Sequence, residues 1–189
     1  MRLKHTAMSK INKVAIFCGS KTGNNDLYLM QAKEIAGILA ENKIELIYGG
    51  GRNGIMGAVA DTVMAQHGIV RGVIPQILTK WEHQHEGISE LLIVEDMHVR
   101  KRKLYELCDA AIILPGGFGT LDELFEILTW NQLSIHDKKI FILNTAGFYN
   151  HLLAHMQHIA TEGFLYGKLE EVLTVLNTPN EFRSYITTN

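Results

Sequence analysis

The chain has 189 residues, a length that suits one domain and is short for two. Hydrophobic residues make up 47% of it and charged residues 20%, which excludes a wholly disordered chain. The 18 basic and 20 acidic residues give a net charge of −2, so the basic excess that is typical of nucleic-acid-binding proteins is absent.

Short β-branched segments alternate with longer amphipathic ones along the chain. After a flexible tail at residues 1–13, the pattern predicts, in chain order, strand 14–18, helix 26–42, strand 45–48, helix 55–67, strand 69–74, an irregular segment 75–89, strand 91–94, helix 97–108, strand 110–114, helix 121–133, strand 140–143, helix 149–162, strand 172–175 and helix 180–186. This alternation predicts an α/β fold, a Rossmann-like doubly wound parallel sheet with helices on both faces, formed by residues 14–189 as a single domain. No apolar run approaches the roughly 18 residues of a membrane helix, so no membrane partner is expected.

A first glycine cluster lies at residues 49–57, between a strand and a helix. Its sequence GGGRNG matches the pattern GxGxxG, but the acidic residue that a dinucleotide site needs about 20 residues further on is absent. Glycines expose backbone N–H groups, and a helix N-terminus favours an anion, so a phosphate suits this segment. A tight turn is the alternative, but four glycines in six residues exceed what a turn requires. We therefore expect Gly50, Gly51 and Gly54 to bind phosphate.

A second cluster has the sequence PGGFGTLDE at residues 115–123, again between a strand and a helix. Gly116, Gly117, Gly119 and Thr120 are the expected phosphate-binding residues here, and both clusters are expected at one edge of the sheet, holding one nucleotide from two sides. Thr120 also suits an N-cap, and Glu123 three residues later completes a capping box. On the pattern alone, catalysis and helix capping are equally good roles for Glu123.

A run of four basic residues, residues 100–103, opens the helix for which Asp96 is the expected N-cap. Cations at this end oppose the helix dipole, which favours a bound anion, although a solvated basic face is the usual role of such a run. Arg100 and Lys103 share a helix face while Lys101 points elsewhere, so only some of these residues can face one site.

Histidines and cysteines indicate no metal or disulfide chemistry. His151, His155 and His158 share the polar face of one helix, which suits a solvated surface better than a metal site. Glu82 and its histidine neighbours lie instead in the irregular segment, where binding residues concentrate. Cys18 and Cys108 are expected to be buried thiols in a reducing cytoplasm. No metal or cofactor is expected.

Three ordered motifs resemble those of the LONELY GUY family, whose members are often labelled lysine decarboxylases. The family patterns YGGGxxGLMG, MHxRK and PGGxGTxxE correspond to residues 48–57, 97–101 and 115–123. The segments 17–20, 130–136 and 143–149 are similar as well, and the likeness extends from residue 14 to residue 165. Departures are mild: Ile55, Val99 and Ser134 replace a usual leucine, glutamate and glycine, and Val99 bears on base preference.

The resemblance implies a phosphoribohydrolase, which hydrolyses the N-glycosidic bond of nucleoside 5′-monophosphates such as cytokinin riboside 5′-monophosphate and AMP to the free base and ribose 5-phosphate. It implies Arg100 and Glu123 as catalytic residues, and a homodimer with the site near the interface. The substrate-binding positions carried over are Glu82, Arg100, Lys101, Gly117, Phe118, Gly119, Thr120, Leu121, Asp122, Glu123 and Thr129.

The chemistry suits these two residue types. Glycosidic cleavage builds positive charge on the sugar, so a carboxylate such as Glu123 beside C1′ stabilises the transition state and orients water. Arg100 is too basic to donate a proton, but it can donate hydrogen bonds to the leaving base or hold Glu123, and the sequence leaves both roles open.

Three other functions compete with hydrolysis. A non-catalytic nucleotide or molybdenum-cofactor carrier has the same architecture and similar glycine loops, but it is less similar around Arg100 and Glu123. Lysine decarboxylation needs a lysine that forms a Schiff base with pyridoxal phosphate, and no lysine here has that setting. Single-stranded DNA binding conflicts with the net charge of −2.

Overall fold

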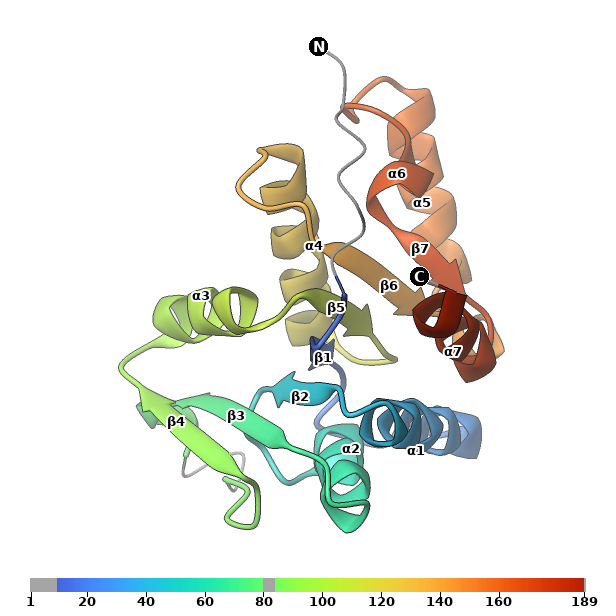
Figure 1. Ribbon diagram of the computed structural model, residues 1–189. Coiled ribbons are helices and arrows are strands. Elements are labelled where there is room, and N and C mark those ends of the chain that lie inside the picture. The colour runs from blue at the N-terminus through green and yellow to red at the C-terminus, as the bar shows by residue number, and fades with distance from the viewer. Residues whose placement is uncertain (1–9, 80–83, 189) are drawn as a thin grey trace.

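The computed structural model describes residues 10–79 and 84–188. Its core is a seven-stranded parallel sheet in the order β4-β3-β2-β1-β5-β6-β7 (Figure 1). The strands are β1 (Lys13–Phe17), β2 (Glu45–Tyr48), β3 (Val70–Pro75), β4 (Glu90–Val94), β5 (Ala110–Ile113), β6 (Lys139–Leu143) and β7 (Thr174–Leu176). The predicted α/β fold with a doubly wound parallel sheet is confirmed.

Helices cover both faces of this sheet. One face packs against α1 (Asp26–Glu41), α2 (Gly54–Ala65) and α7 (Pro179–Thr188). The other face packs against α3 (Met97–Leu107), α4 (Phe118–Gln132), α5 (Asn150–Thr161) and α6 (Leu169–Val172). Two 3₁₀ turns complete the described elements, η1 (Gln76–Leu78) and η2 (Thr145–Gly147).

The central strands are apolar on both faces, as buried parallel strands must be. Along β1, Val14 and Ile16 enter one core cluster, whereas Ala15 and Phe17 enter the cluster on the opposite face. Burial of both faces fixes the register of these strands, because a one-residue slip would exchange the two sets of side chains.

The position of β1 creates the place for a ligand. β1 lies between β2 and β5, and the chain passes from β1 to α1 on one face but from β5 to α4 on the other. This is a topological switch point, where the loops at the carboxyl ends of two neighbouring strands diverge and leave a crevice.

The ends of the chain differ slightly from the predicted elements. The backbone N–H groups of Asn12 and Lys13 both donate to the Asp109 carboxylate at 2.9 Å, so β1 begins at Lys13. The last strand begins at Thr174, two residues later than predicted, because α6 precedes it. Within the described residues, no helix combines the length and hydrophobicity that crossing a membrane requires.

Candidate active site

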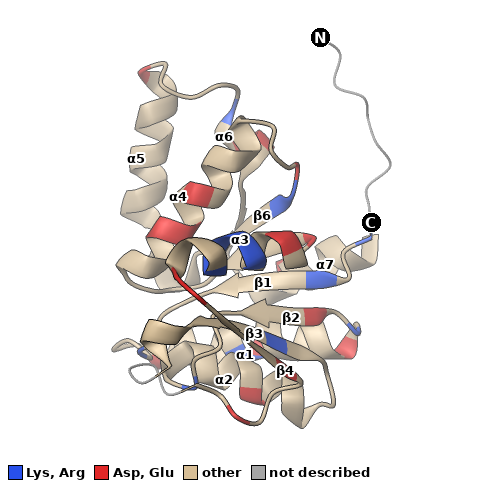
Figure 2. Ribbon diagram, turned by 90° about the vertical axis from the view of Figure 1, so that its left-hand side faces the viewer, with Lys and Arg blue, Asp and Glu red and all other residues tan. Residues whose placement is uncertain are grey.

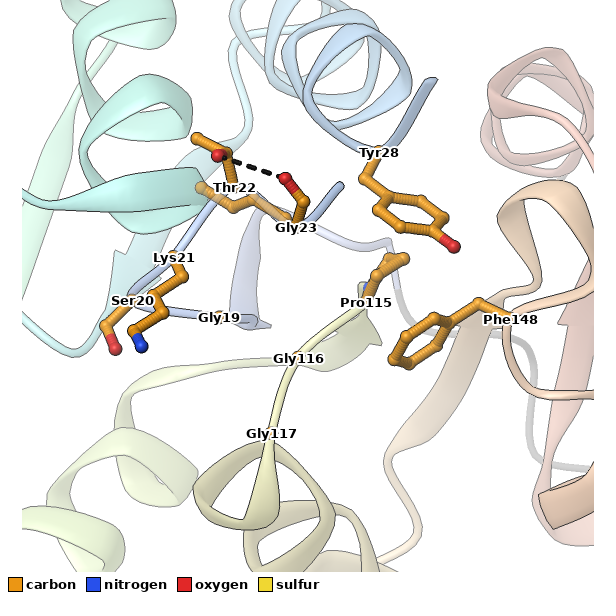
Figure 3. Close-up of a pocket in the computed structure, with 11 residues that line it drawn as sticks. Gly19, Ser20, Lys21, Thr22, Gly23, Tyr28, Pro115, Gly116, Gly117 and Phe148 are labelled. Atoms are coloured by element: carbon orange, nitrogen blue, oxygen red, sulfur yellow. Dashed lines mark hydrogen bonds between the residues drawn. The ribbon is translucent and has the colours of Figure 1, made fainter. Parts of the chain in front are cut away.

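A pocket of about 230 Å³ lies in the crevice between the loops that follow β1 and β5 (Figure 3). The β1 loop contributes residues 19–23, and the β5 loop contributes Pro115, Gly116 and Gly117. Tyr28 and Phe148 form an aromatic wall at one end, with their ring centroids 5.4 Å apart in an edge-to-face arrangement. The pocket therefore has an aromatic end and an end bounded by polar loop residues.

The helix that begins beside this pocket, α4, begins earlier than predicted. Its N-cap is Gly117 and its first residue is Phe118, so Thr120 is the third residue of the helix and not its cap. The predicted capping box between Thr120 and Glu123 is therefore wrong, because Glu123 lies in the second turn, beyond the positions that cap a helix. Helix capping no longer explains why a glutamate is at this position.

The first turn of α4 offers free backbone donors. The N–H groups of Phe118, Gly119 and Thr120 have no acceptor among the residues that the structure describes. A Cβ built on Gly117 or Gly119 would meet nothing within 4 Å, whereas Thr120 is buried against Gly116. Together with the helix dipole, three open N–H groups form the kind of surface that binds a phosphate.

The first glycine cluster is placed differently. At the start of α2, the N–H groups of Ile55 and Met56 both donate to the carbonyl oxygen of Gly19, at 3.2 and 3.4 Å. Gly54 has φ of +59°, and a Cβ there would overlap the backbone of Ser20 and Lys21. Donors and glycines at this helix start are thus used to pack α2 against the β1 loop.

Gly50 and Gly51, the other expected phosphate-binding residues of this cluster, are buried and do not line the pocket. Gly50 has φ of +79° and lies against Ile74 and Leu91. Of the two clusters predicted at one sheet edge, the second lines the pocket through Gly116 and Gly117. The first supports the loop opposite and contributes Ile55 to the lining.

Arg100 is buried, with 6% of its surface exposed, and lies over the carboxyl ends of β2 and β3. Its Nε donates to the carbonyl oxygen of Val73 and its Nη2 to that of Gly49, each at 3.1 Å. As predicted, α3 is capped by Asp96, whose carboxylate accepts from the N–H of Val99 at 2.8 Å. Backbone carbonyls thus fix the orientation of the Arg100 guanidinium.

Glu123 is half-buried on α4. Burial raises the pKa of the Cys18 thiol, and the charge of Glu123 raises it further, so this carboxylate lies close to the carboxyl end of β1. The single O–H of Tyr105 on α3 is shared between the Glu126 carboxylate at 2.9 Å and the Glu123 carbonyl oxygen at 3.3 Å. These contacts join α3, which carries Arg100, to α4, which carries Glu123.

Lys101 and Lys103 of the basic run on α3 form ion pairs, whereas Arg102 is exposed. Figure 2 shows basic residues of α3 in blue beside acidic residues of α4 in red. Lys101 Nζ lies 2.7 Å from the Asp122 carboxylate and 3.3 Å from that of Glu126. Burial alone would lower the pKa of Lys101, but these two carboxylates raise it above its usual value. Lys103 pairs with Glu106 at 2.9 Å on the surface. Arg100 is the member of this run whose guanidinium is bound to the backbone at the ends of the strands.

The remaining residues carried over from the family fall in three places. Phe118 is 92% exposed beside the pocket, whereas Leu121 packs against the core on the far side of α4. Thr129 lies on an exposed part of α4 and donates to the Phe125 carbonyl oxygen at 2.7 Å, in a separate apolar groove between α4, α5 and α6. Glu82 lies outside the described residues.

Sequence reasoning missed the other side of the pocket. Ser20, Lys21 and Thr22, together with Tyr28 and Phe148, received no role from composition or spacing. A signal was present, since a polar GSKTG segment directly follows the first buried strand, and the loop after that strand borders the switch point in folds of this kind.

Cysteines and histidines lie largely where the pattern predicts. Cys18 and Cys108 are buried free thiols, and His151, His155 and His158 are exposed on α5. Within residues 10–79 and 84–188, no group of three His, Cys, Asp or Glu side chains is arranged to hold a metal ion.

Comparison with known proteins shows which family the chain is similar to. The family described as "Possible lysine decarboxylase" matches residues 56–186. The chain is 43% identical over 153 residues to a cytokinin riboside 5′-monophosphate phosphoribohydrolase of Rhodococcoides fascians, covering 80% of this chain and 77% of that one. An Arabidopsis thaliana protein of the same name is 39% identical over 183 residues, covering 96% of this chain and 85% of that one.

Solved structures share the fold at lower identity. The molybdenum cofactor binding protein of Rippkaea orientalis superposes with a TM-score of 0.70 at 18% identity, over 96% of this chain and 98% of that one. DNA processing protein A of Helicobacter pylori gives a TM-score of 0.59 at 16% identity, over 93% and 80%. Likenesses at this level of identity show the architecture and leave the chemistry to the sequence relatives.

Proposed function

Because the chain belongs to the family of cytokinin riboside 5′-monophosphate phosphoribohydrolases, we propose that its crevice hydrolyses the N-glycosidic bond of nucleoside 5′-monophosphates, giving the free base and ribose 5-phosphate. The observation that carries this proposal is that one helix, α4, carries both the expected phosphate-binding residues and Glu123. Its open first turn borders the pocket, and its second turn carries Glu123 at the end of β1.

The phosphate subsite is the first turn of α4. The open N–H groups of Phe118, Gly119 and Thr120 point out of the helix start, and the absence of side chains at Gly117 and Gly119 leaves room for close approach. A 5′-phosphate bound there holds the nucleotide at a fixed distance from the second turn of the same helix. The reacting C1′ atom is thereby positioned relative to Glu123, which lowers the entropic cost of reaching the transition state.

Glu123 acts on the sugar. As the bond from C1′ to the base breaks, positive charge builds on the ribose, and the ionised carboxylate stabilises that charge and orients the attacking water. The leaving base takes the bonding electron pair, water supplies the hydroxyl at C1′, and the remaining proton of that water ends on the released base. Tyr105, whose hydroxyl holds the Glu123 backbone, keeps this carboxylate in place.

Arg100 acts on the opposite side of the reacting bond. Its guanidinium is held by the carbonyl oxygens of Gly49 and Val73, so it is oriented before substrate arrives. A buried, fixed cation over the ends of β2 and β3 stabilises negative charge that develops on the leaving base, without acting as a proton donor.

The position of Thr129 supports the proposal that the chain forms a homodimer. Thr129 lies two turns beyond Glu123, in a groove apart from the pocket, so it reaches a substrate only in a site of a second copy. Such a pair of chains would work in the reducing cytoplasm that the two free thiols suit, with no nucleic-acid or membrane partner.

Product analysis with a panel of nucleoside 5′-monophosphates tests the proposal, with AMP and N6-substituted AMP analogues beside GMP, CMP and UMP. We expect the free base and ribose 5-phosphate in equal amounts, with purine nucleotides preferred, and the relative rates of AMP and its analogues identify the preferred base. Release of no base from any nucleotide, together with tight binding of AMP, would contradict hydrolysis and favour a carrier of the same fold.

A further inference from the structure

A phosphate dianion beside Glu123 needs a compensating cation, because like charges at close range repel. The basic residues of α3 do not supply it. Arg100 is held by the backbone carbonyls of Gly49 and Val73, Lys101 lies between two carboxylates of α4, and Lys103 pairs within its own helix. Arg102 is exposed on α3 and does not line the pocket. The cation that faces the phosphate subsite therefore comes from another element.

Lys21 is a basic residue that lines the pocket. It is exposed, and no hydrogen bond or ion pair joins its ammonium to another residue in the part of the chain that the structure describes. Figure 3 shows its side chain extending beside that of Ser20, away from the aromatic wall of Tyr28 and Phe148. An uncompensated cation thus occupies the polar end of the pocket.

The backbone that carries Lys21 is tightly held. The N–H of Gly19 donates to the Pro115 carbonyl oxygen at 3.1 Å, which ties this loop to the one that precedes α4. On its other side, Gly54 approaches the peptide between Ser20 and Lys21 so closely that a Cβ would overlap it. Lys21 therefore extends from a fixed base opposite the first turn of α4, and only its flexible stem moves.

We propose that Lys21 binds the 5′-phosphate from across the crevice, and that it makes the enzyme selective for phosphorylated nucleosides. This inference rests on the proposed function and deepens it. The ligand class is phosphomonoesters of ribose, so Lys21 contacts the product ribose 5-phosphate as well as the substrate. The donor is an ammonium, which holds a phosphate as a point charge.

Binding of ribose 5-phosphate tests Lys21 without requiring turnover. Isothermal titration calorimetry compares the wild type, Lys21→Met and Lys21→Arg with Lys33→Met, which removes an exposed charge from α1. We expect Lys21→Met to weaken binding by about tenfold to a hundredfold, the range of one charge-assisted hydrogen bond. Lys21→Arg should retain most of the affinity, and Lys33→Met should match the wild type. Equal affinity of wild type and Lys21→Met would overturn the proposal.

The ratio of kcat/KM for AMP to that for adenosine gives a second readout. Lys21→Met should lower the AMP value by about tenfold or more and leave the adenosine value nearly unchanged, because adenosine has no phosphate for Lys21 to bind. An equal fall with both substrates would mean that Lys21 only supports the loop, which contradicts the proposal. Failure of the wild type to hydrolyse AMP would instead contradict the proposed function, and calorimetry would still decide the role of Lys21.

Discussion

The guanidinium of Arg100 occupies the space in which a side chain at residue 49 would lie. Its Nη2 donates to the Gly49 carbonyl oxygen at 3.1 Å, and a Cβ built on Gly49 would overlap that same nitrogen. The first glycine of the GGG segment is therefore needed to seat an arginine that follows 51 residues later. The glycine cluster and the basic run, two separate motifs in the sequence, form one structural unit.

Gly49→Ala should damage catalysis far more than folding. The new methyl group meets the far end of the Arg100 side chain, which can move aside where backbone could not. The guanidinium then leaves its position over the strand ends and loses its hydrogen bonds to the Gly49 and Val73 carbonyl oxygens. We expect kcat to fall by about a hundredfold, as small misplacements of catalytic groups produce, with a change of only a few degrees in Tm.

A double-mutant cycle provides the control. If Gly49→Ala acts through Arg100, it should have little further effect on activity in an Arg100→Ala background. Gly57→Ala is a contrasting variant, because its Cβ would overlap the Arg52 carbonyl oxygen, and backbone cannot move aside as a side chain can. It should unfold at lower temperature. Full additivity of Gly49→Ala with Arg100→Ala would show that the two residues act separately.

Glu123→Gln should abolish hydrolysis and leave AMP binding and folding almost intact. The substitution keeps the shape of the side chain but removes the negative charge that stabilises the ribose in the transition state, so kcat should fall by at least about a thousandfold. Steady-state kinetics with AMP measure the loss, calorimetry measures binding, and Glu34→Gln on the exposed side of α1 controls for removal of a carboxylate. Turnover by Glu123→Gln near the wild-type rate would remove Glu123 from the chemistry.

Gly119→Ala should raise KM for AMP and not lower stability. A Cβ at this position meets nothing within 4 Å, and alanine is the better helix former, so the free energy of unfolding should stay the same or rise by up to about 1 kcal/mol. The methyl group would instead project from the first turn of α4 and obstruct the phosphate. Thermal unfolding and AMP kinetics on the same preparation check both statements, and an unchanged KM would place the phosphate elsewhere.

Much of the fold follows from the sequence because the strands are continuous apolar segments and the helices keep their period. The residue at which a helix begins depends on backbone geometry, which residue spacing does not specify. Thr120 has the residue type of an N-cap, yet α4 begins at Phe118, because the extended backbone of Gly117 provides the cap.

The residues of the candidate site are likewise only partly predictable from the sequence. The basic run of α3 has the composition of an anion site, but Lys101 is paired with Asp122, which is 21 positions away and adjacent only in the folded chain. Likewise, glycine content alone does not separate Gly119, which faces open space, from Gly54, which packs against the β1 loop. A sequence pattern identifies the basic and glycine residues of a site. The folded structure is needed to tell which of them face a ligand and which pack against other residues.

The free energy of unfolding should fall in alkaline solution, because buried Cys and Tyr side chains ionise more readily in the unfolded chain than in the folded one. Burial raises the pKa of Cys108 from 9.0 to about 11, so between these values the folded chain binds a proton that the unfolded chain releases. The stabilisation is complete below pH 9 and is lost as pH rises towards 11, at most about 3 kcal/mol. Urea denaturation at pH 7, 9, 10 and 11 measures it.

Comparison with Cys108→Ala isolates this thiol. Cys18 and three buried tyrosines also have raised pKa values, so both proteins lose stability at high pH, but the variant should lose less between pH 9 and 11. Parallel curves for the two proteins would show that Cys108 does not contribute.

The comparison of AMP with adenosine tests the proposed hydrolysis of nucleoside 5′-monophosphates, because the crevice combines a phosphate subsite with a glycosidic centre on one helix. Binding of the phosphate positions C1′ against Glu123, so its removal should lower kcat as well as raise KM. We expect kcat/KM for AMP to exceed that for adenosine by at least about two orders of magnitude, on the order of 3 kcal/mol, with ADP and ATP poor substrates. Adenine released from adenosine as fast as from AMP would contradict the phosphate subsite and indicate a nucleoside hydrolase.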